Sequence, residues 1–385
     1  MDALTPSFIL ASLALLGWLY LALMRGAFWR ILLDPHAPEP DNWPSVDIIV
    51  PARNEADMLP QSLPSLLVQD YPGPWRVLLV DDHSADSTYG VAHRVARETN
   101  KSDRLTVINA PDLPAGWSGK VATMRAGAQQ SSSDYILFTD ADIAHNDQSL
   151  RRLMARTVYD NLDLNSLMVK LQCSTFAEKL LIPAFVFFFA MLYPFRLVNK
   201  PTSTVAAAAG GVMLVKRKAL QNIGGLERIK SALIDDCALA RAIKDNGGNF
   251  GAQGRIRLSL TDNVHSLRPY PTIAHVLRMI SRTAFTQLRY SYLFLLGTVL
   301  GLVFLFFTPI LVPLWGSPTE SLVAYAALLV MAGIYAPIIY FYGFCVVWAL
   351  TLPVAALLYI HATLVSAWNY ARGKGGQWKG RSQAP

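Results

Sequence analysis

The sequence predicts an α/β domain built on a mainly parallel sheet, with membrane helices before and after it in the chain. Three observations support this prediction. Short β-rich runs alternate with helical runs between residues 45 and 290, which is the pattern of βα units. Long uncharged apolar runs precede and follow that region. The whole chain is 52% hydrophobic and 16% charged, whereas soluble domains carry about 25% charged residues.

The charges and cysteines exclude several classes of function. The net charge of +7 suits a protein that lies beside anionic head groups or binds anionic substrates. The basic residues are scattered and form no long runs, so they do not indicate nucleic-acid binding. Cys173, Cys237 and Cys345 are far apart and form no CxxC pair. They predict neither a disulfide framework nor a zinc site.

The first segment, residues 1–30, is predicted to be an N-terminal transmembrane anchor. Its apolar run, residues 8–24, is just long enough to span a bilayer as a helix. An acidic residue precedes the run, and Arg25 and Arg30 follow it, which is the reverse of a secretory signal peptide. The positive-inside rule then places the following chain in the cytoplasm. A buried core helix is the alternative interpretation.

The region from 45 to 290 is predicted to be a cytoplasmic α/β domain. Apolar and β-branched runs predict strands at 46–50, 77–80, 105–108, 135–139, 166–171 and 212–215. Amphipathic runs predict helices at 58–68 and 89–98. In open parallel sheets, ligands bind beyond the carboxyl ends of the strands. We therefore expect functional side chains directly after these strands.

Acidic residues occupy these positions. They are Glu55 after the first strand, Asp81 and Asp82 after the second, Asp140 and Asp142 after the fourth, and Asp235 and Asp236 at the start of a helical run. Acids also favour strand ends and helix N-termini for structural reasons, but several at one sheet edge favour a site. If Asp140 and Asp142 keep strand geometry, their carboxylates point the same way. Together they could hold a hard divalent cation against a diphosphate.

Other residues could complete such a site. Asp236 is the candidate general base, with Asp235 as second choice, because adjacent acids perturb each other's pKa. Arg278 and Arg282 share a face of a predicted helix and are expected to bind phosphates, although arginines that snorkel at a membrane surface would look the same. Lys120 follows a glycine-containing turn. It either contacts a phosphate or base, or is a solvated lysine.

The histidines and one glycine pair leave alternatives open. His83, His145 and His265 have no metal-binding spacing and are expected at the surface or in the core, with His265 as an alternative metal ligand. Gly210 and Gly211 follow a run of small residues. They either allow close approach of the backbone to a ligand or mark the start of a strand.

The last region, residues 291–385, is predicted to be a C-terminal transmembrane region with a basic tail. Glu320 is its only charged residue up to residue 367. At about 20 residues per crossing, three spans fit at 293–315, 321–342 and 344–367. Three crossings would place the tail outside, but its basic residues Arg372, Lys374, Lys379 and Arg381 argue for inside. The alternative is that one block is interfacial or re-entrant.

A shorter apolar run, residues 182–193, is too short to cross a bilayer. It is expected to be either a core helix or an interfacial helix that docks the domain on the membrane.

The ordered motifs resemble those of the family-2 glycosyltransferases. They are VDIIVPARNE, VLLVDDHSADST, GKVATMRAGA, ILFTDAD, GGVMLVKRKALQNIGG and IDDCALARAIKDNGG. A closer resemblance is to the hopene-associated glycosyltransferases of bacteria, the HpnB subgroup. It rests on LIPAFVFFFAMLYPF, ALIDDCALARAIK, SLRPY, RTAFTQLRYS and the tail GGQWKG, and it extends over nearly the whole chain.

This resemblance implies a GT-A (Rossmann-like) fold, a nucleotide-diphosphate sugar donor with UDP-sugars favoured, Mg²⁺ or Mn²⁺, and inversion at the anomeric carbon. Carried over by position, the residues that would hold the base and ribose are Pro51, Ala52, Glu55 and Asp82, with Lys120 and Asp140 completing the pocket. Asp142 would bind the metal and Asp236 would be the base. Asp235 stands where the family often has Glu.

The expected function is transfer of one sugar to a membrane lipid, a hopanoid or polyprenyl carrier, by a multi-pass protein of the bacterial inner membrane. The Gln-x-x-Arg-Trp motif of processive members is missing; Arg282 is followed by TAFTQ. This argues against the first alternative, a processive polysaccharide synthase. The second alternative is a non-catalytic lipid-binding or transport accessory protein, which would not need this carboxylate set.

Overall fold

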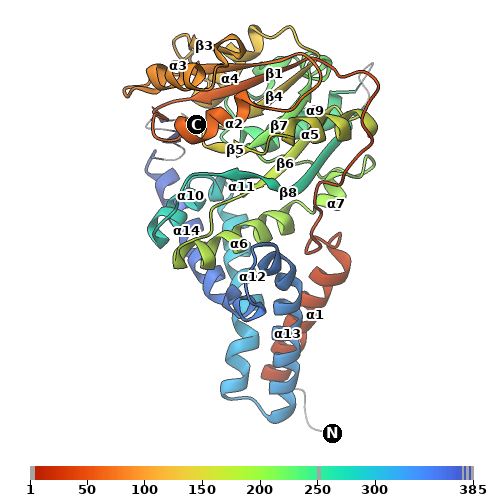
Figure 1. The fold of residues 1–385 in the computed structure, drawn as a ribbon. Coiled ribbons are helices and arrows are strands. Elements are labelled where there is room, and N and C mark those ends of the chain that lie inside the picture. Colours follow the sequence, from red (N-terminus) through yellow and green to blue (C-terminus); the bar gives the residue numbers. More distant parts are fainter. Residues whose placement is uncertain (1–4, 249–252, 375–376, 379–380, 383–385) are drawn as a thin grey trace. The chain divides into compact units, whose positions relative to one another are not determined.

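The computed structural model describes residues 5–248 and 253–374, together with 377–378 and 381–382. Within them the chain forms two units, which we call the sheet unit and the helical unit (Figure 1). The sheet unit consists mainly of Leu32–Gln172 and Leu197–Pro269, and the helical unit mainly of Met1–Ile31, Cys173–Arg196 and Tyr270–Gly375. Of the predicted basic tail and the GGQWKG motif, Gly375, Gly376, Lys379 and Gly380 lie outside the described residues.

The sheet unit contains one eight-stranded sheet with the strand order β3-β2-β1-β4-β7-β6-β8-β5. Its strands are β1 (Val46–Ala52), β2 (Trp75–Asp81), β3 (Leu105–Asn109), β4 (Tyr135–Thr139), β5 (Ile143–His145), β6 (Leu164–Lys170), β7 (Val212–Lys216) and β8 (Ile256–Ser266). Its helices are α2 (Leu59–Leu67), α3 (Thr88–Glu98), η1 (Ser102–Arg104), α4 (Gly119–Gln129), α5 (Ser149–Tyr159), α8 (Arg217–Asn222), η2 (Gly225–Ile229) and α9 (Asp235–Asn246). A short hairpin, β9 (Gln377–Trp378) and β10 (Arg381–Ser382), follows near the end of the chain.

The α/β fold class is confirmed, and the sheet is mixed but mainly parallel, as predicted. The strands from β3 to β4 run parallel to one another, whereas β7 is antiparallel to both β4 and β6. The segment between β6 and β7 starts and ends at the same edge of the sheet, so β7 runs in the opposite direction to β6. β5 and β8 were not predicted, because β5 has three residues and β8 carries the polar run TDNVHS.

The core of the sheet unit lies on both sides of the central strands. All seven residues of β1 are buried, and Val46, Ile48, Val50 and Ala52 belong to one apolar cluster that includes residues of α2, α3 and α5. Such continuous apolar strands are typical of sheets covered by helices on both faces. On one face α4 approaches β1 so closely that a Cβ at Gly127 would lie 2.6 Å from Ile49 Cγ2.

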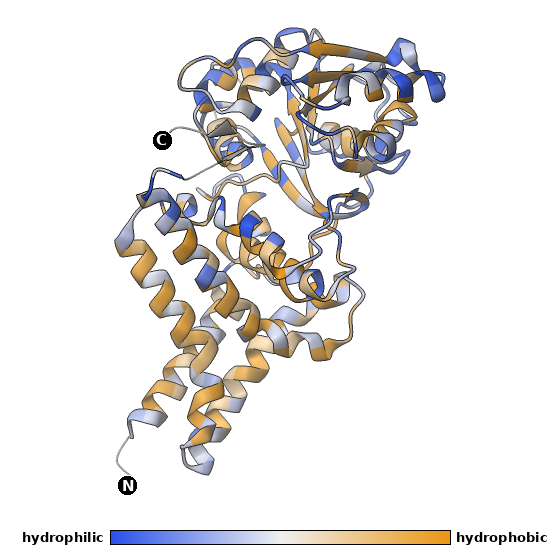
Figure 2. Cartoon of the chain, turned by 90° about the vertical axis from the view of Figure 1, so that its left-hand side faces the viewer, coloured by the Kyte–Doolittle hydropathy of each residue, from blue (hydrophilic) through white to orange (hydrophobic). Residues whose placement is uncertain are grey.

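In the part of the chain that the structure describes, the helical unit contains four helices that are long and apolar enough to cross a membrane, at Pro6–Met24, Tyr292–Leu314, Pro318–Phe341 and Val346–Ala371. Figure 2 shows that hydrophobic residues predominate along these helices. In the assigned elements they are α1 (Pro6–Met24), α12 (Tyr292–Leu311) with η4 (Val312–Leu314), α13 (Pro318–Phe341), and η5 (Val346–Thr351) with α14 (Leu352–Ala371). The shorter helices are α6 (Phe176–Leu192), α7 (Phe195–Val198), α10 (Ile273–Ser281) and α11 (Ala284–Gln287).

Polar contacts fix the directions of the long helices. The hydroxyl of Thr5, the N-cap of α1, donates to the carboxylate of Glu320 in the first turn of α13. The two helices therefore start side by side and run the same way. The indole of Trp18 in α1 donates to the carbonyl of Leu305 in α12 at 2.8 Å. At its far end, α14 places Tyr370 in a stack with Tyr290, which precedes α12, with ring centroids 4.5 Å apart.

The apolar run at 182–193 lies in α6, which is a core helix of this unit. Most of its side chains are buried, and it packs on α10, α13 and α14. Its N-terminus has a capping box between Thr175 and Glu178, and Glu178 also accepts a hydrogen bond from the amide of Tyr270 at 2.6 Å. A buried carboxylate is stable here because backbone amides satisfy it.

Candidate active site at the carboxyl edge of the sheet

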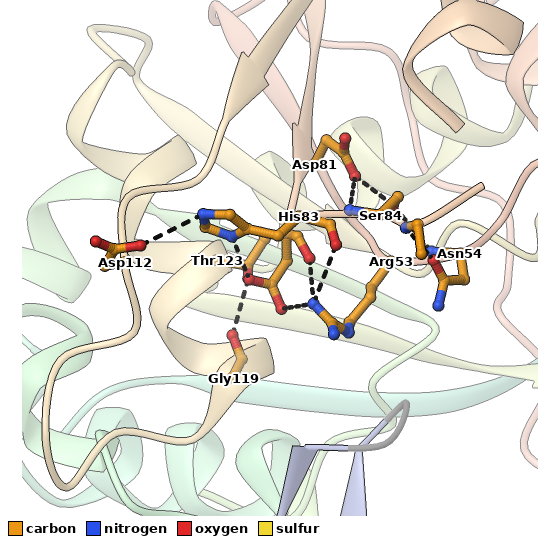
Figure 3. Close-up of polar contacts among 10 residues, drawn as sticks. Arg53, Asn54, Asp81, His83, Ser84, Asp112, Gly119 and Thr123 are labelled. Carbon is orange, nitrogen blue, oxygen red and sulfur yellow. Dashed lines mark hydrogen bonds and ion pairs between the residues drawn. The ribbon is translucent and has the colours of Figure 1, made fainter. Parts of the chain in front are cut away.

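Two loops at the carboxyl edge of the sheet are joined by side-chain hydrogen bonds (Figure 3). The first loop follows β1 and the second follows β2, and these strands are parallel neighbours. Pro51 and Ala52, predicted to hold a base and ribose, are the last two residues of β1 and are buried. Pairing with β2 fixes their backbone at the point where the first loop starts.

Asn54 is the main link between these loops. Its backbone is left-handed, with φ of 51°, a conformation that asparagine adopts more readily than most residues. Its amide donates to Ser84 Oγ at 2.9 Å, and its Oδ1 accepts from the amide of Ala85 at 2.8 Å. A second link is made by Asp86, whose Oδ2 accepts from the amide of Ala56 at 3.1 Å. The two loops thus form one cross-linked surface.

Asp82, also predicted to bind base and ribose, is buried and contacts Arg53. Nη1 of Arg53 donates to the backbone oxygens of Asp82 and His83 and lies 3.5 Å from the Asp82 carboxylate. The His83 ring lies 3.4 Å from Asp82 and 3.5 Å from Asp112. Arg53 had no role in the predicted site. Arg53 lies in the motif ARNE, next to residues that were predicted to belong to the site, and this position could have identified it.

The two acids after β4 depart from the predicted geometry. β4 ends at Thr139 and residues 141–142 lie in a turn, so the strand alternation expected to align Asp140 and Asp142 does not reach them. Asp140 Oδ1 lies 2.8 Å from Lys120 Nζ, whereas Asp142 Oδ2 lies 2.6 Å from Arg268 Nε. Each carboxylate therefore contacts a different cation.

Lys120 joins the acid after β4 to the acids of α9. Besides Asp140, its Nζ lies 3.3 Å from Asp235 Oδ2. Burial opposes the charged amine, but the carboxylates of Asp140 and Asp235 outweigh it and raise the pKa of Lys120. A Cβ at Gly210 would lie 3.2 Å from this Nζ. Gly210 and Gly211 directly precede β7, so their interpretation as the start of a strand is confirmed, and close approach to a ligand stays a prediction. Lys120 is an ion-paired residue, and the solvated alternative is wrong.

Asp236 is held by two backbone amides. Gly210 donates to Oδ2 at 2.9 Å, and Cys237 donates to Oδ1 at 2.6 Å. Burial and the neighbouring charge of Asp235 raise the pKa of the Asp236 carboxyl to about 6, while Lys120 acts in the opposite direction. A carboxyl with a pKa near neutrality, fixed in orientation, has the properties of a general base.

Arg268 bridges two acids of the predicted site and was itself missed. It follows β8, and its Nη2 donates to Glu55 Oε1 at 3.1 Å and to Oε2 at 2.8 Å, while Nε donates to Asp142. Glu55, predicted to hold base and ribose, thus anchors an arginine. SLRPY contains this residue, but nothing local in that run indicates its partners.

The remaining predicted residues lie elsewhere. Arg278 in α10 and Arg282 at its C-cap belong to the helical unit and are exposed, and their contact with phosphate stays a prediction. His145 is buried between the hydroxyls of Thr139 and Ser149, at 3.0 and 3.1 Å, and burial lowers its pKa to about 3. His265 is exposed on β8.

The carboxylates of Asp140 and Asp142 fit Mg²⁺ or Mn²⁺, because hard cations prefer carboxylate oxygens. Among the described residues, no group of three or more His, Cys, Asp or Glu side chains could hold a metal ion alone. A cation here would take further ligands from bound phosphate or water.

The sequence of this region matches a known family. Residues 47–224 match the family described as Glycosyl transferase family 2. The match runs from β1 to just beyond α8 and includes Lys120, Asp140 and Asp142. It ends before Asp235 and Asp236.

Curated relatives support the same assignment. An N-acetylglucosaminyltransferase of Mesorhizobium japonicum is 38% identical over 112 residues, which are 28% of this chain and 24% of that protein. An undecaprenyl-phosphate 4-deoxy-4-formamido-L-arabinose transferase of Pectobacterium carotovorum is 26% identical over 116 residues, which are 30% of this chain and 34% of that protein. The chain therefore spans between about a quarter and about a third of the length of these relatives.

Among solved structures, the mannosyltransferase PcManGT of Pyrobaculum calidifontis, in complex with GDP-Man and Mn²⁺, has the same fold. The TM-score is 0.61 at 19% identity, over 94% of this chain and 98% of that one. Residues 47–224 are therefore similar in sequence to glycosyl transferase family 2, and the GT-A fold predicted from the sequence is confirmed.

Proposed function

We propose that this chain is a membrane-bound, inverting, metal-dependent glycosyltransferase of the HpnB subgroup, which moves one sugar from a nucleotide-diphosphate sugar to a hydroxyl group of a membrane lipid. The observation that carries the proposal is Asp236, whose two oxygens accept hydrogen bonds from the amides of Gly210 and Cys237. A fixed carboxylate with a raised pKa suits proton removal from an acceptor hydroxyl.

The chemistry follows from these residues. As the acceptor oxygen bonds to the anomeric carbon, its proton passes to Asp236 and the bond from that carbon to the diphosphate breaks. A bound Mg²⁺ or Mn²⁺ would neutralise charge on the leaving nucleoside diphosphate, held by Asp142 with Asp140. Pro51, Ala52 and Asp82 would line the base and ribose pocket, and Arg278 and Arg282 would bind the phosphates.

A hydroxyl acceptor is favoured over a phosphate acceptor by the same geometry. A lipid phosphate is already ionised near neutral pH and needs no base, whereas a hydroxyl does. We therefore favour a hopanoid over a polyprenyl phosphate. A UDP-sugar is the favoured donor, and UDP-N-acetylglucosamine is the first to test, since several relatives are named N-acetylglucosaminyltransferases.

We propose that the protein lies in the bacterial inner membrane with the sheet unit in the cytoplasm. Arg25 and Arg30 directly follow α1, which supports this orientation. α13 runs in the same direction as α1, so α12 must run in the opposite one. The stack of Tyr370 on Tyr290 supports a re-entrant or in-plane α14 that returns the tail to the side where α12 begins, in agreement with the basic tail.

The test is transfer by the full-length protein in detergent, with UDP-N-acetylglucosamine, other UDP-sugars and GDP-mannose, each with Mn²⁺, Mg²⁺ or EDTA and with a hopanoid or polyprenyl phosphate acceptor. We expect metal-dependent release of nucleoside diphosphate with one donor. Asp236→Asn should lower the rate by about 10²- to 10⁴-fold. Asp245→Asn, in the same helix but exposed, is the matched control and should leave the rate unchanged.

Two results would contradict the proposal. If Asp236→Asn keeps full activity with a hydroxyl acceptor, the assignment of the base is wrong. If no donor is turned over although nucleotides bind, the accessory alternative replaces the enzyme.

A further inference from the structure

Arg268 links two acids of the candidate donor site. Its guanidinium spans from Asp142, after β4, to Glu55, after β1, with hydrogen bonds of 2.6, 2.8 and 3.1 Å. The side chains of Glu55 and Asp142 are 8% and 14% exposed, whereas that of Arg268 is 29% exposed. The arginine is therefore the solvent-facing member of a largely buried triad.

The backbone holds Arg268 in this place. Ser266, the last residue of β8, pairs with Ile143 in β5, and the amide of Leu267 donates to the carbonyl of Asp142 at 2.8 Å. The short antiparallel β5–β8 contact thus brings the end of β8 to the turn that carries Asp142. Nη1 of Arg268 makes no hydrogen bond to a described residue. It can therefore donate hydrogen bonds to a new anionic partner.

Arg268 and a divalent ion compete for Asp142. Arg268 Nε contacts its Oδ2 at 2.6 Å, so an ion that coordinates both carboxylate oxygens would displace the arginine, and an ion on Oδ1 alone would lie close to the guanidinium. The guanidinium and the metal would also repel each other across a short distance. The two can share the site only if further negative charge is present, and a diphosphate supplies it. Phosphate oxygens are metal ligands and also good bidentate partners for arginine.

We propose that Arg268 is a positioning residue that occupies Asp142 until the donor diphosphate arrives, and thereby makes binding of the divalent cation depend on the nucleotide. This inference rests on the proposed function only in assigning Asp142 to the metal. In the nucleotide-free protein Arg268 forms ion pairs with Asp142 and Glu55. When the diphosphate binds, Arg268 turns toward it and releases the carboxylate. Metal and nucleotide then bind with positive cooperativity.

The test is direct binding of Mn²⁺, followed through the electron paramagnetic resonance signal of the free ion, to full-length protein in detergent, with and without UDP or GDP. For the wild type we expect weak binding alone and at least about ten-fold tighter binding with nucleotide. Arg268→Gln should bind Mn²⁺ alone at least about ten-fold more tightly than the wild type, and nucleotide should then add little.

The matched control is Arg151→Gln. Arg151 also bridges two acids, Glu39 and Asp70, with contacts of 2.7 and 3.0 Å, but it lies on α5. Its replacement should leave Mn²⁺ binding unchanged. If Arg268→Gln does not fold, Arg268→Lys keeps the charge and loses the bridge between the acids, and should bind Mn²⁺ alone more tightly than the wild type does.

Three outcomes would overturn the inference. One is equal Mn²⁺ affinity in wild type and both Arg268 variants. Another is a wild-type affinity that nucleotide does not change. The last is lack of Mn²⁺ binding to any form with nucleotide present. Because no sugar is transferred in this experiment, a failure of the proposed function, seen as no turnover, is distinguishable from a failure of the inference.

Discussion

The amide of Gly210 donates a hydrogen bond to Oδ2 of Asp236 at 2.9 Å. Gly210 lies just before β7, and Asp236 lies in the first turn of α9. A carboxylate held in this way has its orientation set before any substrate binds. The bond ties the candidate base to the sheet, and the absence of a side chain at position 210 leaves room for Lys120 beside it.

Gly210→Ala should lower the transfer rate by about ten-fold or more, because small displacements of catalytic groups are costly. The added Cβ would lie 3.2 Å from Lys120 Nζ and 3.4 Å from Asp236 Oδ2. The free energy of unfolding should change by less than about 1 kcal/mol. Steady-state transfer and chemical denaturation measure both quantities. Gly90→Ala, where a Cβ has nothing within 4 Å, is the control, and equal rates for the two variants would refute the prediction.

The transfer rate should rise with pH below about 6 and level off above it, because Asp236 must be ionised to act as base and its pKa is raised to about 6. Asp235→Asn removes the like charge that contributes to this rise. The rising limb should therefore move to lower pH in that variant. Single-turnover rates across the pH range provide the measurement. A limb that stays in place or moves upward would show that Asp236 is not the titrating group.

Lys120→Met should move the same limb to higher pH, because the amine lowers the pKa of Asp236. The change also leaves Asp140 and Asp235 without their cation, at a cost of about 1–3 kcal/mol in the free energy of unfolding. Opposite shifts in Asp235→Asn and Lys120→Met would identify one coupled cluster. Lys218→Met, at an exposed position of α8, should shift neither the limb nor the stability.

The tail should lie on the cytoplasmic side. In cells, Lys374→Cys in a Cys345→Ser background should react with an impermeant maleimide only after the inner membrane is opened. Thr319→Cys, exposed beside the start of α13, should react in intact spheroplasts. Labelling of both positions in intact spheroplasts would mean that α14 crosses the membrane, and the proposed return of the chain would be wrong.

The central strands could be predicted from the sequence because they are continuous apolar runs covered by helices on both faces. For the same reason the acids after β1, β2 and β4 stood out against their surroundings. β8 could not be predicted in this way. Its polar residues hide the strand, and Arg268, which follows it, lies 126 residues from Asp142 and 213 from Glu55. No local pattern contains a contact of that range.

Predictions that assumed regular geometry failed where the chain turned. Asp140 and Asp142 look aligned if β4 continues, but the strand ends at Thr139. Likewise, the length and hydropathy of residues 344–367 are compatible with a segment that crosses the membrane and also with one that turns back. The contact between Tyr290 and Tyr370 relates the two ends of the region. The amino-acid composition shows how apolar a helix is, but it does not show on which side of the membrane the chain leaves that helix.

The mutual hydrogen bonds of Asn54, Ser84, Ala56 and Asp86 have a consequence for engineering and for divergence of the sequence. Neither loop supplies its own scaffold, because each is shaped by side chains of the other. If only one loop were replaced by that of a relative in order to change nucleotide preference, the new loop would lack the side chains of the other loop that shape it. Changes at these positions should accumulate together, and a successful transplant has to carry both loops.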